Sequence, residues 1–177
     1  MYKILLSSSI LGYLSYNFLS NYMYVGNKAI IYYSEAHLTE WNSLIHTFFM
    51  PISMLGLLLI IPVIFKLKPV NSKKLMYSLY FFYGGHYMNI NIKVSLLYYF
   101  IYYFIVKNAI KIYNLLYLRN IKYILILGII LFGGGLTIQE IIGHYIGGDI
   151  ASRYEGIPNA ILYAKYYSVA YILKYLN

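Results

Sequence analysis

Long apolar runs alternate with short polar segments along the chain, and this pattern predicts a helical membrane protein. Residues 44–65 form a run of 22 without a formal charge, which is long enough to cross about 30 Å of hydrocarbon. Further runs cover 75–92, 94–106 and 123–143, of which 94–106 is short for a full span. The fold class predicted is therefore an all-α, polytopic membrane bundle with about four transmembrane helices plus N- and C-terminal helices.

The N-terminal segment is harder to place. Residues 4–27 carry no charge but several Ser and Asn side chains, so either a spanning helix or a helix lying in the membrane interface fits them. A signal peptide is disfavoured, because only Lys3 precedes the segment and no clear small-residue cleavage site follows. We expect an N-terminal helix within residues 1–32 and a membrane-embedded domain over 33–177, whose last helix begins near Pro158.

Composition strengthens the membrane interpretation. The chain is 61% hydrophobic and only 11% charged, whereas soluble domains usually carry about 25% charged residues. The net charge of +9 comes from basic residues scattered between apolar runs, which suits membrane flanks and disfavours nucleic-acid binding. There is no cysteine, which excludes disulfides and thiolate chemistry. The 25 tyrosines fit either AT-rich coding DNA or interfacial aromatic belts.

Threading the four runs alternately through a bilayer separates the charges. All four histidines and all five acidic residues then fall on one side. By the positive-inside rule the other side is cytosolic or matrix-like. This arrangement requires the short run 94–106 to cross the membrane. The other side receives nine of the fourteen basic residues, namely Lys66, Lys68, Lys73, Lys74, Lys107, Lys111, Arg119, Lys122 and Lys174.

Two polar stretches, 33–51 and 139–160, hold all five acidic residues and three of the four histidines. Histidine is the commonest protein ligand for iron, zinc and copper. His37 and His46 are nine residues apart, so they would share a metal only if the chain turned between them, and residues 38–42 are the expected turn. Glu140 and His144 share a helix face, which predicts that Glu140 orients or joins His144 at a metal.

Simpler interpretations of the same residues remain open. An interfacial histidine such as His86 usually serves as a hydrogen-bonding residue, and acidic residues such as Glu35 and Glu40 are usually solvated. Asp149 and Arg153 are four residues apart, so an ordinary ion pair accounts for them. A haem-binding membrane subunit is a further alternative, because histidines on facing helices can be axial ligands.

The two stretches resemble the motifs of iron-dependent 2-hydroxy fatty acid dioxygenases, membrane proteins of phytosphingosine degradation. The front motif of that family has tyrosine, histidine, asparagine, histidine and proline; the rear motif has a glutamine, a Gly-His pair, a glutamate and a Pro-Ala pair. Here the rear glutamate follows an insertion at 145–154, and a residue separates Pro from Ala. The matching residues are Tyr33, His37, Asn42, His46, Pro51, Gln139, Gly143, His144, Glu155, Pro158 and Ala160.

This resemblance implies an Fe(II) site that uses O2 to shorten a 2-hydroxy fatty acid by one carbon. It implies the ligands His37, His46 and His144, with His86 as a possible fourth that the threading adds. Gln139, Asn42 and Glu155 are the candidate catalytic or headgroup-contacting residues. The implied partners are the lipid bilayer, the fatty acid and O2, and the implied location is the endoplasmic reticulum. The alternative is a non-catalytic subunit that assembles with other membrane subunits, for example in the mitochondrial inner membrane.

Overall fold

A computed structural model describes residues 2–19, 27–149 and 157–176, and every regular element within them is helical. The predicted all-α class is therefore confirmed. Helix η1 has the wider π-helical form and continues directly from α6. The elements are α1 (Tyr2–Leu19), α2 (Asn27–Ser34), α3 (Glu40–Ile64), α4 (Pro69–Met88), α5 (Ile92–Tyr117), α6 (Ile121–Ile138), η1 (Gln139–Ile146) and α7 (Ile157–Lys174).

Polar residues at the ends of the apolar runs start the helices. Thr39, Asn91 and Asn120 are the N-caps of α3, α5 and α6, and each side-chain oxygen accepts a hydrogen bond from a backbone N–H of the first turn. Such caps satisfy donors that have no partner inside the helix. Pro69 occupies the first turn of α4, where its missing N–H costs nothing. The starts of these helices are thus determined by single capping residues or a proline in the short polar segments between the apolar runs.

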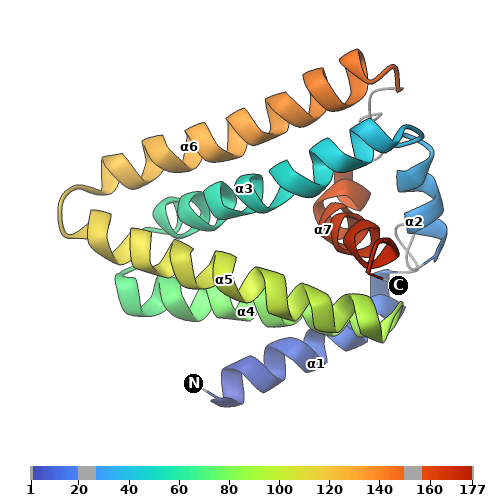
Figure 1. Ribbon diagram of the computed structural model, residues 1–177. Helices are drawn as coiled ribbons and strands as arrows, with labels where there is room; N and C mark the ends of the chain where they lie inside the picture. Colours follow the sequence, from blue (N-terminus) through green and yellow to red (C-terminus); the bar gives the residue numbers. More distant parts are fainter. Residues whose placement is uncertain (1, 20–26, 150–156, 177) are drawn as a thin grey trace.

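The helices form two antiparallel pairs that lie side by side (Figure 1). Helix α3 pairs with α6, and α4 pairs with α5, while α1 packs along α4. Helix α7 crosses one end of the bundle and contacts α2, α3 and α5. The turns from α3 to α4 and from α5 to α6 lie at one end, and the start of α3, the end of α4 and η1 lie at the other (Figure 1). We call these the basic end and the histidine end.

Glycines set the close approach of α3 to α6. A Cβ atom added at Gly56 would overlap the backbone of Phe132 and Gly128, so the two backbones cross at this point. The run Gly133-Gly134-Gly135 of α6 has the small residues that allow a second contact of this kind. Only Gly135 does so, against Ser53, whereas a Cβ at Gly133 or Gly134 would meet nothing within 4 Å.

Two of the described helical segments are long and apolar enough to cross a membrane: Glu40–Ile64, and Ile121–Ile146, which joins α6 to η1. The expected run 94–106 lies inside the 26-residue helix α5, which is long enough to cross, but its basic residues Lys93, Lys107 and Lys111 make it less apolar than a typical span. Helices therefore occupy all four expected positions, and two of them meet the composition of a membrane span.

Many of the tyrosines lie in the core and not at its margins. Tyr87, Tyr98, Tyr102, Tyr113 and Tyr163 are fully buried between α4, α5 and α7. The rings of Tyr98 and Tyr102 stack at 4.6 Å, and the hydroxyl of Tyr87 donates to the carbonyl of Leu162 at 2.6 Å. A buried phenol usually needs such a partner. Interfacial belts therefore do not account for this group of tyrosines.

Candidate metal centre

Three histidines from distant parts of the sequence meet at the histidine end. His37 lies in the turn after α2, His46 in α3 and His144 in η1, and all three are buried. One ring nitrogen from each lies within 4.8 Å of the other two. The ring centroids are 4.3 to 5.0 Å apart, and the rings meet edge to face. This group could hold a metal ion, as the sequence predicted for these three residues.

The expected turn brings His37 back to His46. The chain leaves α2 at Ser34, and Thr39 caps the new helix α3. His37 thus lies before the start of α3, and His46 lies in its second turn on the buried face. Because the two residues are not on one continuous helix, their nine-residue separation does not place them on opposite faces.

Helix η1 buries Gln139, Gly143 and His144. On an α-helix Gln139 would point about 140° away from a residue five positions later, whereas η1 has the wider π-helical form, whose hydrogen bonds join residues five apart. Glu140 is exposed instead. The prediction that Glu140 orients or ligates beside His144 is therefore wrong, because its side chain is exposed while His144 is buried.

Asn42 connects His144 to a carboxylate. Its amide Nδ2 lies 3.2 Å from Nδ1 of His144, and it donates to Asp149 Oδ2 at 2.8 Å and to the carbonyl of Ala36 at 3.0 Å. The amide oxygen of Asn42 is buried and has no hydrogen-bond partner among the described residues. This polar atom beside the histidines is consistent with a site that takes a further ligand.

Sequence reasoning missed Asp149. Its Oδ2 accepts from Asn42 and also from the backbone N–H and hydroxyl of Thr39, at 3.1 and 3.0 Å. Burial alone would raise the pKa of Asp149, but the hydrogen bonds from Asn42 and Thr39 outweigh it and hold that pKa below its usual value. The carboxylate thereby ties the loop after His144 to the start of α3. The suggested partner Arg153 lies outside the described residues.

Gln139 bridges α6 and α3 beside the centre. Its amide Nε2 donates to Ser53 Oγ at 2.9 Å and to the carbonyl of Gly135 at 3.0 Å. Its amide oxygen is a second buried acceptor without a hydrogen-bond partner within the described part of the chain. Gln139 therefore lies on the same buried face as His144, and among the described residues its amide makes no hydrogen bond to the imidazoles.

Of the other expected residues, the structure describes the side chain of His86, which does not join this group. His86 is buried near the same end of α4, but its Nδ1 lies 2.9 Å from Ser15 Oγ and its Nε2 lies 2.9 Å from the hydroxyl of Tyr163. The structure thus does not place it as a fourth ligand; it has the hydrogen-bonding role that was the alternative. Glu155 lies outside the described residues, as does the side chain of Tyr33.

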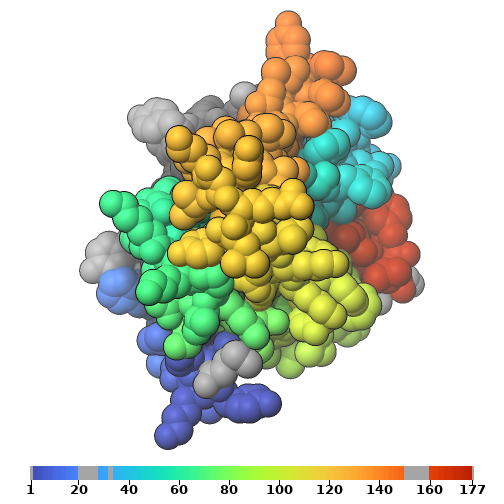
Figure 2. All heavy atoms as spheres, turned by 90° about the vertical axis from the view of Figure 1, so that its left-hand side faces the viewer, coloured from blue at the N-terminus to red at the C-terminus, as the bar shows by residue number. Residues whose placement is uncertain are grey.

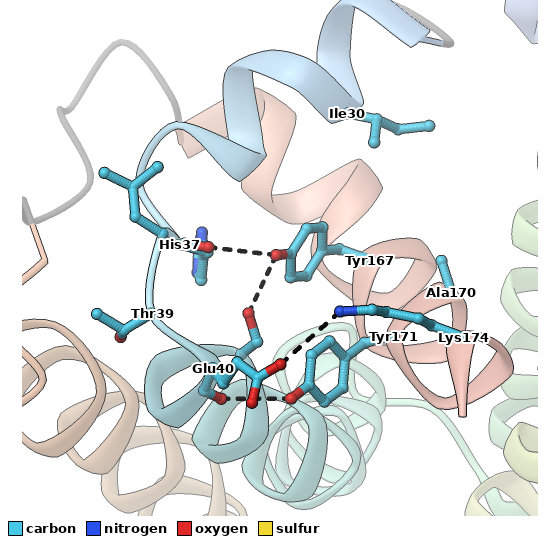
Figure 3. Close-up of a pocket in the computed structure, with 10 residues that line it drawn as sticks. Ile30, His37, Thr39, Glu40, Tyr167, Ala170, Tyr171 and Lys174 are labelled. Atoms are coloured by element: carbon cyan, nitrogen blue, oxygen red, sulfur yellow. Dashed lines mark hydrogen bonds and ion pairs between the residues drawn. The ribbon is translucent and has the colours of Figure 1, made fainter.

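A pocket of about 310 Å³ opens beside His37 (Figure 3). Tyr167, from α7, packs against the ring of His37 at 5.2 Å, and its hydroxyl lies 3.1 Å from Ser43 Oγ. Glu40 and Lys174 pair across the pocket at 3.8 Å, with both side chains largely exposed. Lys174 therefore lies at the histidine end, contrary to its expected place on the basic side. The remaining lining residues are Ile30, Leu38, Thr39, Ala170 and Tyr171.

The donor set limits which groups suit the centre. Three imidazoles suit iron, zinc, copper or nickel, and leave positions for other ligands. A haem between two of these histidines does not fit, because their rings already contact one another edge to face. Nε2 of His46 and Nε2 of His144 are only 3.2 Å apart, so no gap exists for a macrocycle.

No protein-family model matches this chain. No curated protein and no solved structure matches it either.

Proposed function

We propose that this protein is a membrane-bound Fe(II)-dependent dioxygenase that shortens 2-hydroxy fatty acids by one carbon. The observation that carries the proposal is that His37, His46 and His144 meet as one buried group that could hold a metal ion. His46 and His144 do so although 98 residues separate them in the sequence. These are also the three histidines of the motif resemblance. The pocket beside His37 supports the proposal, because it gives a substrate a route to the histidines.

Each group in the centre has a separate task in this proposal. The three histidines hold the metal, and Asp149, through its hydrogen bonds from Asn42 and Thr39, holds the loop after His144 against the start of α3. Iron bound there would supply the open coordination positions at which O2 and the 2-hydroxy acid react. The overall reaction is R–CH(OH)–COOH + O2 → R–COOH + CO2 + H2O, in which the substrate loses four electrons and O2 gains them. Burial of the histidines keeps bulk water away from the reacting atoms.

The pocket suits the polar head of an acyl chain. Its volume lies near the lower limit of about 300 Å³ for small-molecule sites, so the head and the first methylenes fill it. Lys174 and the hydroxyl of Tyr171 at its rim can receive a carboxylate, with Lys174 released from its loose pairing with Glu40. The remaining chain then lies along exposed apolar side chains of the bundle, in contact with lipid.

The location proposed is a membrane, and the two long apolar helices support it. The endoplasmic reticulum follows from the resemblance alone, with the mitochondrial inner membrane as the alternative. A protein of either membrane would present the histidine end to one aqueous face and the basic end to the other.

The proposal is tested on detergent-purified protein loaded anaerobically with Fe(II). Elemental analysis should find one iron per chain, and 2-hydroxypalmitate should drive O2 consumption and yield pentadecanoate with CO2. Palmitate, which lacks the 2-hydroxyl, is the substrate control, and His144→Ala should lose both iron and turnover. Absence of stoichiometric iron, together with turnover unchanged in His144→Ala, would show that the proposal is wrong.

A non-catalytic subunit of a larger membrane assembly is the second candidate. The segment Ile121–Ile146 leaves most of its surface uncovered by the bundle, and Ile126, Ile129 and Ile130 are more than half exposed. A partner subunit would bury this face as well as lipid does. Co-purification with fixed partners and an iron-free centre would favour this candidate over the enzyme.

A further inference from the structure

The basic end of the bundle carries a concentrated positive surface. Four helix ends meet there: the ends of α3 and α5 and the starts of α4 and α6 (Figure 1). Figure 2 views this end directly and shows the segments near residues 66–75 and 110–130 side by side on one face. The exposed basic side chains of these segments are Lys66, Lys68, Lys73, Lys74, Lys111, Arg119 and Lys122.

No acidic residue offsets this charge within the segments that form the surface, since residues 41–139 contain neither Asp nor Glu. The five acids flank that interval, and those the structure describes belong to the α2–α3 turn, the start of α3, η1 and the loop after it. The positive charge at this end is therefore a local excess, and it is not simply the net positive charge of the chain spread evenly over its surface. Such a surface favours an anionic partner.

Large apolar side chains project between the basic ones. Phe65 is 67% exposed, Val70 68% and Leu118 86%, and all three lie in or beside the two turns that carry the charges. Exposed apolar side chains would not contribute to a surface that binds only phosphates in water. An interface with lipid accepts both kinds of group, since methylenes bury the apolar tips while headgroups meet the cations.

Lys66 directly follows Phe65, the C-cap residue of α3. Lys66 has φ +51°, the left-handed conformation that commonly holds glycine after a helix. Its N–H donates to Val63 O at 3.0 Å, and Leu67 N–H donates to Pro62 O at 2.8 Å, so the turn closes α3 in the usual way. A lysine therefore lies at the tip of this turn, in a left-handed backbone conformation that glycine adopts at lower cost.

We propose that the basic end binds the headgroups of anionic phospholipids, with its exposed apolar side chains inserted among the upper methylenes. The two helices that are long and apolar enough to cross a membrane, α3 and the segment Ile121–Ile146, have one end each at this surface. It therefore lies where a bilayer around those helices presents its phosphates. This inference concerns lipid recognition and does not depend on a metal or on catalysis.

The test measures binding of a fluorescent short-chain phosphatidylglycerol to the full-length protein in neutral detergent by anisotropy. Phosphatidylcholine with the same label is the control lipid. The variants are the pairs Lys73→Gln with Lys74→Gln, and Arg119→Gln with Lys122→Gln. The matched control is Lys28→Gln with Lys93→Gln, which removes two exposed charges next to the opposite end of the bundle.

We expect phosphatidylglycerol to bind more tightly than phosphatidylcholine, and the preference to weaken as salt is raised. Each removed cation at the basic end should lower the affinity about fivefold, the equivalent of about 1 kcal/mol per basic residue near an anionic surface. Equal affinity for the two lipids, or an equal loss in the control pair, would overturn the inference. The inference would also be overturned if a labelled oligonucleotide bound as tightly as phosphatidylglycerol and both double variants at the basic end abolished that binding. The surface would then bind polyanions in general.

Discussion

The Nε2 atoms of His46 and His144 face each other at 3.2 Å, although 98 residues separate them in the sequence. Two nitrogens at this distance share one hydrogen when both rings are neutral. A metal would replace that hydrogen bond with two coordinate bonds, and His37 stands beside both rings to add a third. The fold thus brings the three candidate ligand atoms within 4.8 Å of one another.

Metal binding should therefore stabilise the folded protein, because an ion that binds only the folded state shifts the unfolding equilibrium. At a free metal concentration 100 times the dissociation constant, the gain is about 2.7 kcal/mol. We expect Fe(II), added anaerobically, to raise the thermal midpoint of the wild type and a chelator to reverse the rise. His46→Ala should show no rise, and a rise equal to that of the wild type would argue against this centre.

Asp149→Asn should weaken metal binding without removing any ligand. The carboxylate accepts three hydrogen bonds from Asn42 and Thr39, and an amide oxygen is a weaker acceptor than a carboxylate. Outer partners of metal ligands typically contribute 10- to 100-fold to affinity, and we expect about 10-fold here, measured by competition with a metal-sensitive dye. Glu140→Gln is the control, because Glu140 is exposed and should not alter the affinity.

The helices were predictable because uncharged runs and capping residues are local signals. The apolar run 94–106 is shorter than the helix that contains it, Ile92–Tyr117, because Lys107 and Lys111 end the run and not the helix. Lysine is a good helix former, and one face of that helix is exposed. Charge marks where an apolar run stops, which is not always where the helix stops.

The three histidines of the centre were also predictable from their motifs, but their surroundings were not. The four-residue spacing of Glu140 and His144 predicted a shared face, but Gln139 lies on the buried face with His144 and Glu140 is exposed. Asp149 acts through Asn42, which is 107 residues away, and no local pattern shows such a contact. Its sequence spacing to Arg153 suggested a local pair and concealed the distant one.

Gly56→Ala should destabilise the bundle strongly. A Cβ at this position overlaps backbone atoms of Phe132 and Gly128, and backbone cannot move aside as a flexible side chain can, so α3 and α6 would have to separate. We expect a loss of at least about 2 kcal/mol, in the range of overpacked cores, seen as a lower thermal midpoint in detergent.

Gly134→Ala is the matched control for that substitution, because its Cβ would point into open space. Alanine is favoured over glycine inside a helix by about 1 kcal/mol, so this variant should be as stable as the wild type or more so. If the two variants behaved alike, the close crossing of α3 and α6 at Gly56 would be refuted.

Tyr163→Phe and Tyr102→Phe remove the same atom with opposite consequences. The hydroxyl of Tyr163 lies 2.9 Å from Nε2 of His86. Ser15 donates to Gly12 O at 2.6 Å, so its oxygen accepts from Nδ1–H of His86 and leaves Nε2 to accept from Tyr163. Without that donor a buried nitrogen loses its partner, which costs about 1 to 3 kcal/mol.

The hydroxyl of Tyr102 is buried and has no hydrogen-bond partner among the described residues. Removing it relieves the cost of burying an unpaired polar group, so Tyr102→Phe should be neutral or stabilising in chemical unfolding. Metal content should be unchanged in both variants, because His86 does not belong to the three-histidine group. Loss of metal in Tyr163→Phe would contradict that separation.

Lys165 should make the stability of the protein rise with pH. Its ammonium group is buried in α7, 3.9 Å from the centre of the Tyr83 ring, and donates to Ile161 O. Burial lowers the pKa of Lys165 to about 7 in the folded protein, whereas the unfolded chain retains the ordinary value near 10.4. Between these two values the unfolded state binds more protons, so stability increases as pH rises through that window.

The gain from pH 7 to pH 9 should be about 2 kcal/mol if Lys165 acts alone, since each pH unit contributes at most 1.36 kcal/mol. Above pH 10 the trend should reverse, because burial raises the pKa of tyrosines such as Tyr166 to about 12 while unfolded tyrosines ionise. Thermal midpoints measured between pH 7 and 9 test this window. Lys165→Met keeps the length of the side chain without its charge, so it should flatten the profile and raise stability most at pH 7. A profile in Lys165→Met as steep as in the wild type would assign the pH dependence to another group.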